Sequence, residues 1–280
     1  MLYYLKKQKI PLGIFIRDLY PLFDLSPRRT LKEEVLYRAW FASQYFYQKT
    51  ATVLFYPTPP FTTFFDFPHQ ALLPPGARKS WLPEEESKPT QRNIILYSGA
   101  MGKECGERTL FKAMEEVVKK HPETQLLVIS NADCPSPWNE SKWLIHIKGS
   151  LESALPYLPQ IVCGVIPRPL SDYNHIAMPI KTFDYLSLGL PLLVTKCHEL
   201  QSLVESDALG LCCDDNVSDM VKHLFIMLED QERQSTWRAA VRQAVLTKHS
   251  WQCRAEYVLR ELLPYSPLKD ATNLLRNLGK

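Results

Sequence analysis

The stretch from Ile161 to Thr195 limits the possible folds most strongly, because it reads as strand, loop, helix and strand in direct succession. Its ends, 161–166 and 191–195, are short apolar runs. Between them, residues 179–188 have helical spacing and begin with proline, and Gly189 follows. Proline at the first helical position and glycine after the last are typical of a helix. A helix between two apolar strands predicts a right-handed crossover in a parallel sheet.

The loop ahead of this helix lies where such sheets bind ligands, outside the carboxyl ends of their strands. It carries Arg168, Asp172, Tyr173, Asn174 and His175. We expect the helix N-terminus, at residues 177–181, to point free backbone N–H groups into the same crevice, where Lys181 adds a positive charge. This combination favours the binding of a phosphate group.

A strand, a glycine-containing loop and a helix also open the middle of the chain. Asn93 to Ser98 is an apolar strand, and an amphipathic helix follows Gly106. Gly99 and Gly102 lie in the loop between them, with Lys103 as a source of positive charge. This geometry brings backbone N–H groups to a phosphate. The βα units from here to Asp214 predict a doubly wound α/β domain.

Composition excludes several classes of protein. The 280 residues are 45% hydrophobic and 22% charged, which is ordinary for one or two globular domains. A net charge of +3 from scattered basic residues argues against a nucleic-acid partner. Seven irregularly spaced cysteines without a C-x-x-C pair predict reduced thiols and no zinc site. No apolar run reaches about 18 residues and no signal-peptide order is present, so a cytoplasmic location is expected.

The helix and its flanks carry a resemblance to a known family. The segment resembles the donor-site pattern P-x-K-x-x-[ED]-Y-x-x-x-G-x-P of glycosyltransferase family 4, retaining enzymes of the GT-B architecture. The matching residues are Pro179, Lys181, Asp184, Tyr185, Gly189 and Pro191. The resemblance covers residues 93–263 well and the first 80 loosely. It implies a GT-B-like α/β fold, with one doubly wound, Rossmann-like C-terminal domain and a partial N-terminal α/β domain.

The resemblance also implies roles for individual residues. Lys181 and Arg168 would hold the diphosphate of a nucleotide diphosphate-sugar, and Asp184 would bind the ribose. The remaining donor-binding candidates are Gly99, Gly102, Lys103, Tyr173, Asn174, Ala177, Met178, Pro179 and Ile180. Asp18, in the turn RDLYP, is a candidate near the acceptor, and the catalytic set is Asp18, Arg168 and Lys181. The resemblance implies no cofactor and no metal.

The same resemblance implies four parts along the chain. Residues 1–80 would form the partial, acceptor-side domain, and the polar stretch 81–92 a linker. Residues 93–248 would form the nucleotide-sugar domain, and 249–280 a closing helix that crosses back. The family's first domain usually holds three or four more strand–helix units, so we expect a fragment or a shortened member, with a partner that supplies the missing half.

Three residues depart from the family pattern. Ala100 and Cys105 stand where relatives often have arginine and lysine, and Ile176 replaces the first of two glutamates. The expected activity is retaining transfer of a sugar to an acceptor hydroxyl of a glycan or a lipid-linked glycan, in cell-surface polysaccharide synthesis. These departures leave open a catalytically degenerate nucleotide-binding or partner subunit.

Two further alternatives are weaker. A GT-B epimerase would need acid–base carboxylates in the cleft, which the sequence does not show. An NAD-dependent Rossmann enzyme would need G-x-G-x-x-G after a strand, and no strand is followed by it. The tail from Pro264 has a weak amphipathic pattern, so attachment to the cytoplasmic face of a membrane stands beside a plain helix as an interpretation.

Overall fold

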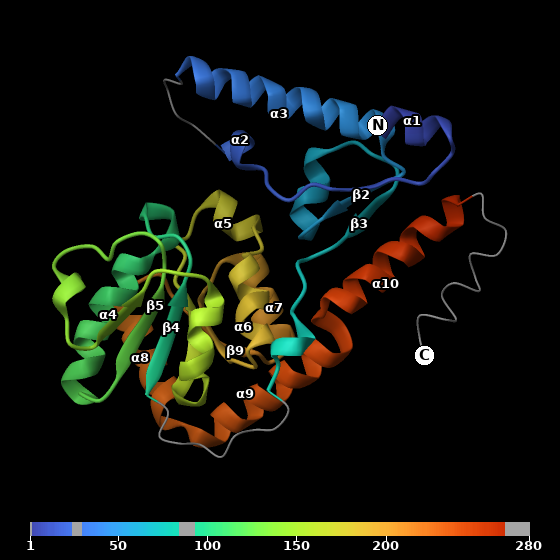
Figure 1. Ribbon diagram of the computed structural model, residues 1–280. Coiled ribbons are helices and arrows are strands. Elements are labelled where there is room, and N and C mark those ends of the chain that lie inside the picture. Colours follow the sequence, from blue (N-terminus) through green and yellow to red (C-terminus); the bar gives the residue numbers. More distant parts are fainter. Residues whose placement is uncertain (1, 24–29, 84–92, 267–280) are drawn as a thin grey trace. The chain divides into compact units, whose positions relative to one another are not determined.

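The computed structural model describes residues 2–23, 30–83 and 93–266, which belong to two compact units. The larger unit is Ala77–Ser250, and the smaller combines Met1–Gly76 with Trp251–Lys280 (Figure 1). The chain therefore crosses between the units twice, after Gly76 and after Ser250.

The larger unit is built on a six-stranded parallel sheet with the order β6-β5-β4-β7-β8-β9. Its strands are β4 (Ile94–Ser98), β5 (Gln125–Ile129), β6 (Leu144–Ile147), β7 (Ile161–Ile166), β8 (Leu192–Thr195) and β9 (Gly210–Cys213). The strand order runs outward in one direction from β4 and in the other from β7, so the switch point lies between them. This confirms the predicted doubly wound α/β fold.

Helices cover both faces of this sheet. Neighbouring residues of β4 alternate between two cores: Ile94 and Leu96 face one, Ile95 and Tyr97 the other. The first core is closed by α6 (Ile180–Ser187) and α7 (His198–Ser206), the second by α4 (Glu107–Lys120) and α8 (Val217–Glu229). α9 (Gln231–Ala244) adds residues to both. Burial on both faces explains why the strands read as continuous apolar runs.

The smaller unit has a three-stranded parallel sheet with the order β1-β2-β3. The strands are β1 (Gly13–Phe15), β2 (Val53–Tyr56) and β3 (Gln70–Leu72), and the helices are α1 (Leu2–Lys7), α2 (Tyr20–Phe23), α3 (Leu31–Thr50) and α10 (Trp251–Leu262). Phe55 and Ala71 of the sheet pack against Tyr257 and Leu262 of α10. The last described helix therefore completes the core of the first part of the chain.

The sequence predicts a helix over residues 30–48, because apolar residues recur every three or four positions, at Leu31, Val35, Ala39, Ala42 and Phe46, and α3 confirms it. It begins at a capping box, in which the Thr30 N–H donates to Glu33 Oε2 (2.7 Å) and the Glu33 N–H donates to Thr30 Oγ1 (3.3 Å). Leu31 and Val35 of its stripe are 83% and 58% exposed, whereas Gln44 is buried. Periodicity identifies a helix, while the neighbours decide which face is covered.

The loop before α6 differs from the prediction in two ways. It contains the short helix α5 (Asp172–Ile176), capped by Ser171, whose Oγ accepts from the Asn174 N–H (3.2 Å). Five residues are too few to show a helical period in sequence. The following helix begins at Ile180, with Pro179 as its N-cap, rather than at Pro179.

Two predicted segments lie largely outside the described residues. Of the linker at 81–92, only 81–83 are described, and the amphipathic tail is described only to Ser266. Within the described ranges, no helix is both long and apolar enough to span a bilayer.

Candidate functional site

A cavity of about 460 Å³ opens at the carboxyl ends of the strands in the larger unit. It lies beyond β4, β5 and β6 and is closed on one side by the first turns of α6. Its lining residues are Ser98, Gly99, Ala100, Met101, Ile129, Ser130, Asn131, Ala132, Gly149, Ser150, Leu151, Lys181 and Asp184. This is the position at which open α/β sheets bind their ligands.

Lys181 crosses the loop that follows β4. Its Nζ lies 4.4 Å from the centroid of the Tyr97 ring and donates to the Tyr97 hydroxyl (3.3 Å). A Cβ at Gly99 would lie 2.6 Å from Lys181 Cε, and Gly99 has a φ of +106°. Glycine therefore serves two needs here: a left-handed backbone and the space for the lysine side chain.

Burial lowers the pKa of Lys181 to about 8. Cys105 and Glu107 act in the opposite direction, and Arg168 adds to the lowering through like charge. A bound anion would favour the protonated form of Lys181. The lysine is thus poised to respond to a negatively charged ligand.

Asp184 lies one turn further along α6 and lines the same cavity. Burial raises its pKa, while Arg78 opposes this and Glu152 reinforces it. Arg78 itself pairs with Glu152 (Nη1–Oε1 3.3 Å) and stacks on the Trp81 ring at 4.1 Å. A carboxylate in this setting can accept hydrogen bonds from ligand hydroxyls.

The buried Tyr185 fixes α6 to the sheet. Its hydroxyl accepts from the Ser98 N–H at the end of β4 (2.8 Å). Its ring lies against Gly164 of β7, where a Cβ would come within 2.3 Å of Tyr185 Cδ2. This close packing sets the position of Lys181 and Asp184 relative to β4.

Arg168 and Asn174 are joined within the loop before α6. Arg168 Nη1 donates to Asn174 Oδ1 (2.9 Å), and Asn174 Nδ2 donates to the Pro169 carbonyl (2.8 Å). Asn174 is only 3% exposed. Its amide therefore holds the arginine and the loop, and is not directed at the cavity.

The backbone N–H groups available at this point differ from those predicted. The Ala177 N–H donates to the Tyr173 carbonyl at the end of α5 (2.9 Å), so it is not free for a ligand. The helix α6 starts later, and its geometry leaves the N–H groups of Ile180 and Lys181 without acceptors inside the helix.

Three of the predicted residues are brought together on the cavity: Gly99, Lys181 and Asp184. The predicted residues of the larger unit that lie outside its lining are Gly102, Arg168, Tyr173, Asn174, Ala177, Met178, Pro179 and Ile180. Lys103 lies in the 3₁₀ turn at Lys103–Cys105, and its side chain is outside the described part. Asp18 belongs to the smaller unit, where it pairs with Arg17 (Oδ2–Nε 2.6 Å).

The prediction from sequence missed the polar rim beyond β5 and β6. Ser130 and Asn131 follow β5, and Gly149 and Ser150 follow β6. Small polar residues directly after parallel strands are the signal that could have indicated them, because those ends share one edge of the sheet.

No group of three or more histidine, cysteine, aspartate or glutamate side chains in the described ranges is arranged to hold a metal ion.

Comparison with known proteins gives the family. Residues 92–230 match the family described as Glycosyl transferases group 1. None of the curated proteins matches the chain in sequence.

Solved structures resemble the chain in fold. WaaG, a glycosyltransferase involved in lipopolysaccharide biosynthesis, is 16% identical with a TM-score of 0.67, over 91% of this chain and 79% of WaaG. Sucrose-phosphate synthase from Thermosynechococcus elongatus is 16% identical with a TM-score of 0.68, over 94% of this chain and 71% of that one. TarM is 12% identical with a TM-score of 0.65, and the match covers 93% of this chain but 57% of TarM.

The matched residues 92–230 contain the strands of the larger sheet and the cavity at their carboxyl ends. The larger unit of this chain belongs to the group 1 glycosyltransferases, within a GT-B-like fold.

Proposed function

We propose that this chain transfers a sugar from a nucleotide diphosphate-sugar to an acceptor hydroxyl, with retention of the anomeric configuration. The observation that supports this most directly is the placement of Lys181 and Asp184, one turn apart on α6 and both on the cavity. A cation at a helix N-terminus suits a diphosphate, and a carboxylate further along suits ribose hydroxyls.

In this proposal the larger unit stabilises the leaving group. As the bond between the sugar and the diphosphate breaks, negative charge grows on the diphosphate oxygens. Lys181, Arg168 and the N–H groups of Ile180 and Lys181 would meet that charge with donors already in place. Asn174 would contribute by orienting Arg168. Asp184 would hold the ribose, next to the polar rim at Ser130 and Ser150.

Solved structures with the same fold suggest the first ligand to use. A mutant of S. aureus TarM was solved in complex with UDP, among other ligands, and E. coli trehalose-6-phosphate was solved bound with UDP-2-fluoro glucose. We extend this to a uridine nucleotide as the first probe for this chain. The acceptor would be a glycan or a lipid-linked glycan on the cytoplasmic face of a membrane, with Asp18 of the smaller unit as the candidate residue that contacts it.

A thermal-shift series tests the proposal. The chain is heated with UDP, GDP or ADP, or with uridine, guanosine or adenosine, without added metal. A ligand that binds only the folded state raises the midpoint in proportion to its affinity. One nucleoside diphosphate should raise it clearly more than its own nucleoside does. Equal shifts of the melting midpoint for a nucleoside and its diphosphate would show that the cavity does not hold the diphosphate.

UDP binding should weaken as the pH rises above about 8. Lys181 carries its charge below that pH and loses it above, because burial lowers its pKa to about 8. Binding of the diphosphate needs the charged form, so the dissociation constant should rise by up to about tenfold per pH unit between pH 8 and 9. Calorimetric titration of UDP at pH 7, 8 and 9 measures this, and uridine should show no such rise.

Replacing Asp184 with asparagine should weaken uridine and UDP alike, by about tenfold each. The carboxylate would accept from ribose hydroxyls that both ligands carry, and hydrogen bonds to charged groups contribute about 1.5–3 kcal/mol. Calorimetry on both ligands gives the comparison. A loss confined to UDP would place Asp184 on the phosphates instead of the ribose.

A second candidate function, a subunit that binds the donor without turnover, has one structural observation in its favour. Glu107 opens α4 beside the glycine loop, is 4% exposed, and its Oε2 has no hydrogen-bond partner among the residues that the structure describes. It lies close enough to Lys181 to influence the lysine pKa. A buried carboxylate there opposes a second anion. Tight UDP binding without hydrolysis or transfer of any UDP-sugar would favour this candidate.

A further inference from the structure

The chain passes between its two units after Gly76 and again after Ser250, and the residues around these two crossings contact each other. In the larger unit, the Ala77 N–H donates to the His249 carbonyl (2.7 Å), and Ala77 forms an isolated parallel bridge with Ser250. In the smaller unit, a Cβ on Gly76 would lie 2.8 Å from the Trp251 backbone nitrogen. The absence of a side chain at Gly76 therefore permits this close approach of two backbones.

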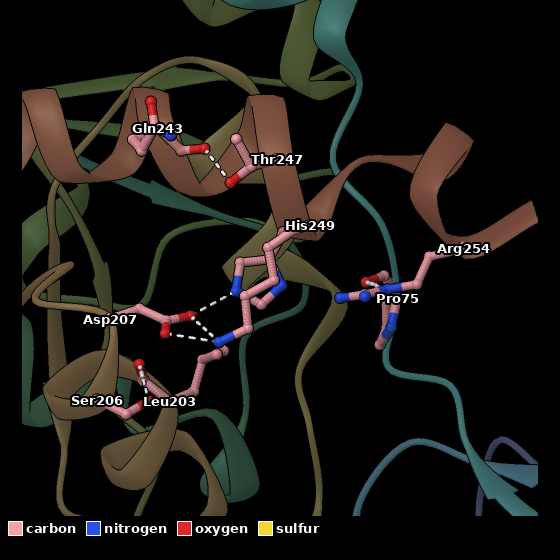
Figure 2. Close-up of polar contacts among 9 residues, drawn as sticks. Pro75, Leu203, Ser206, Asp207, Gln243, Thr247, His249 and Arg254 are labelled. Atoms are coloured by element: carbon pink, nitrogen blue, oxygen red, sulfur yellow. Dashed lines mark hydrogen bonds and ion pairs between the residues drawn. The ribbon is translucent and has the colours of Figure 1, made fainter. Parts of the chain in front are cut away.

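The carboxylate of Asp207, directly after α7, fixes the second crossing to the end of that helix. His249 is 2% exposed, and its Nε2 lies 2.6 Å from Asp207 Oδ2 (Figure 2). Lys248 Nζ contacts both oxygens of the same carboxylate, at 2.6 and 2.9 Å. Burial raises the pKa of Asp207, but hydrogen bonds from Lys248 and His249 outweigh it and leave that pKa below its usual value. Asp207 therefore stays charged and holds two consecutive residues.

Residues next to these crossings also contact α6, the helix that carries Lys181 and Asp184. The His249 ring meets the Phe183 ring edge-on, with centroids 5.7 Å apart. The Arg78 N–H, two residues after Gly76, donates to Ser187 Oγ (2.8 Å). Ser187, which is 1% exposed, donates in turn to the Phe183 carbonyl (2.6 Å). One short helix thus contacts the crossings at one end and carries Lys181 and Asp184 toward the cavity at the other.

We propose that Asp207 and His249 form a latch that couples occupancy of the donor cavity to the two crossings through α6. The latch is closed when the Ala77 N–H is bonded to the His249 carbonyl and open when that bond is broken. A nucleotide held by the first turn of α6 restrains the helix and favours the closed latch. Coupling of this kind is reciprocal, so a closed latch raises donor affinity by the same factor. This inference rests on the proposed function, since it requires a nucleotide in the cavity.

Amide hydrogen exchange of the full chain, with and without UDP, tests the latch. Asp207→Asn keeps the size of the side chain but removes the charge that holds Lys248 and His249. We expect exchange at Ala77 and across α6 to become about 5-fold faster or more, and UDP affinity to fall by a similar factor, because coupling energies are typically of that size. UDP should slow exchange at Ala77 in the unaltered chain and not in the variant.

The chain offers a closely matched control. Glu229 also holds a consecutive lysine and histidine, Lys120 (2.7 Å) and His121 (2.9 Å), but between α4 and α8, and both Glu229 and Lys120 are exposed. Glu229→Gln should leave exchange at Ala77 and UDP affinity unchanged. If Asp207→Asn behaves like Glu229→Gln, the latch is wrong.

A second variant keeps the inference testable if Asp207→Asn does not fold. Ser187→Ala removes the acceptor of the Arg78 N–H and leaves the Asp207–His249 pair in place. UDP should then bind without slowing exchange at Ala77. UDP that binds the unaltered chain without affecting Ala77 would overturn the latch alone. If UDP does not bind at all, the proposed function fails, and exchange at Ala77 and α6 in Asp207→Asn still decides whether the latch holds the helix.

Discussion

Lys181→Ala is expected to weaken UDP binding by about 10- to 150-fold while leaving uridine binding unchanged. The side chain reaches over Gly99 to Tyr97 and lines the cavity at the start of α6. A hydrogen bond to a charged group contributes about 1.5–3 kcal/mol, which corresponds to that range in affinity. Uridine has no phosphate, so it should not detect the loss. Calorimetric titration of both ligands at pH 7 measures the difference.

Lys120→Ala is the matched control for this variant. Lys120 Nζ lies 4.5 Å above the Phe225 ring, much as Lys181 lies above Tyr97, and Lys120 belongs to α4, away from the cavity lining. Its loss should change neither ligand's affinity. A Lys181→Ala variant that binds UDP as well as Lys120→Ala does would show that the diphosphate is held elsewhere.

Gly106→Ala is expected to destabilise the larger unit by about 2–5 kcal/mol and to lower its melting temperature by roughly 5–15 °C. Gly106 precedes α4 with a φ of +72°, and a Cβ there would lie 1.5 Å from the Pro167 carbonyl oxygen. A backbone atom cannot move aside as a side chain can. The glycine loop and the loop before α5 would have to separate, which should also weaken UDP binding. Differential scanning calorimetry with and without UDP gives both results.

Gly189→Ala separates the clash from the backbone strain. Gly189 has nearly the same φ, +68°, but the nearest described atoms to its Cβ would be side-chain atoms of Leu82 and Pro83, at 3.4 Å. The substitution should destabilise by only about 1–2 kcal/mol, the strain of a left-handed alanine. Equal melting temperatures for the two variants would mean that the loops at Gly106 and Pro167 are not in tight contact.

The alternation of apolar runs and amphipathic segments made the larger sheet predictable. The central strands β4, β7 and β8 are buried on both faces, so their apolar runs are uninterrupted, and the glycines at 106 and 189 mark the edges of helices. The smaller unit was less predictable. Its strands β1 and β3 have three residues each, too few for a pattern, and the stripe on α3 gave the helix without its buried face.

The candidate site was predictable where one helix carries it. Lys181 and Asp184 are three residues apart on α6, so a single segment of sequence fixes their relation. Ser130 and Ser150 reach the cavity from two other strands, and only the strand order brings them there. The side chain of Asn174 points back to the Pro169 carbonyl because Asn174 lies in α5, and five residues are too few to show a helical repeat in the sequence. The spacing of residues along the sequence therefore identified the helix that carries Lys181 and Asp184. It did not identify the cavity residues that follow β5 and β6.

We expect the cavity beyond β4 to β6 to hold a nucleoside diphosphate at the N-terminus of α6. A crystal structure of the chain with UDP tests this expectation. We expect phosphate oxygens within hydrogen-bond distance of Lys181 Nζ and the N–H groups of Ile180 and Lys181, with ribose hydroxyls on Asp184. UDP bound outside this cavity, or bound in it with its phosphates away from Lys181, would contradict the account.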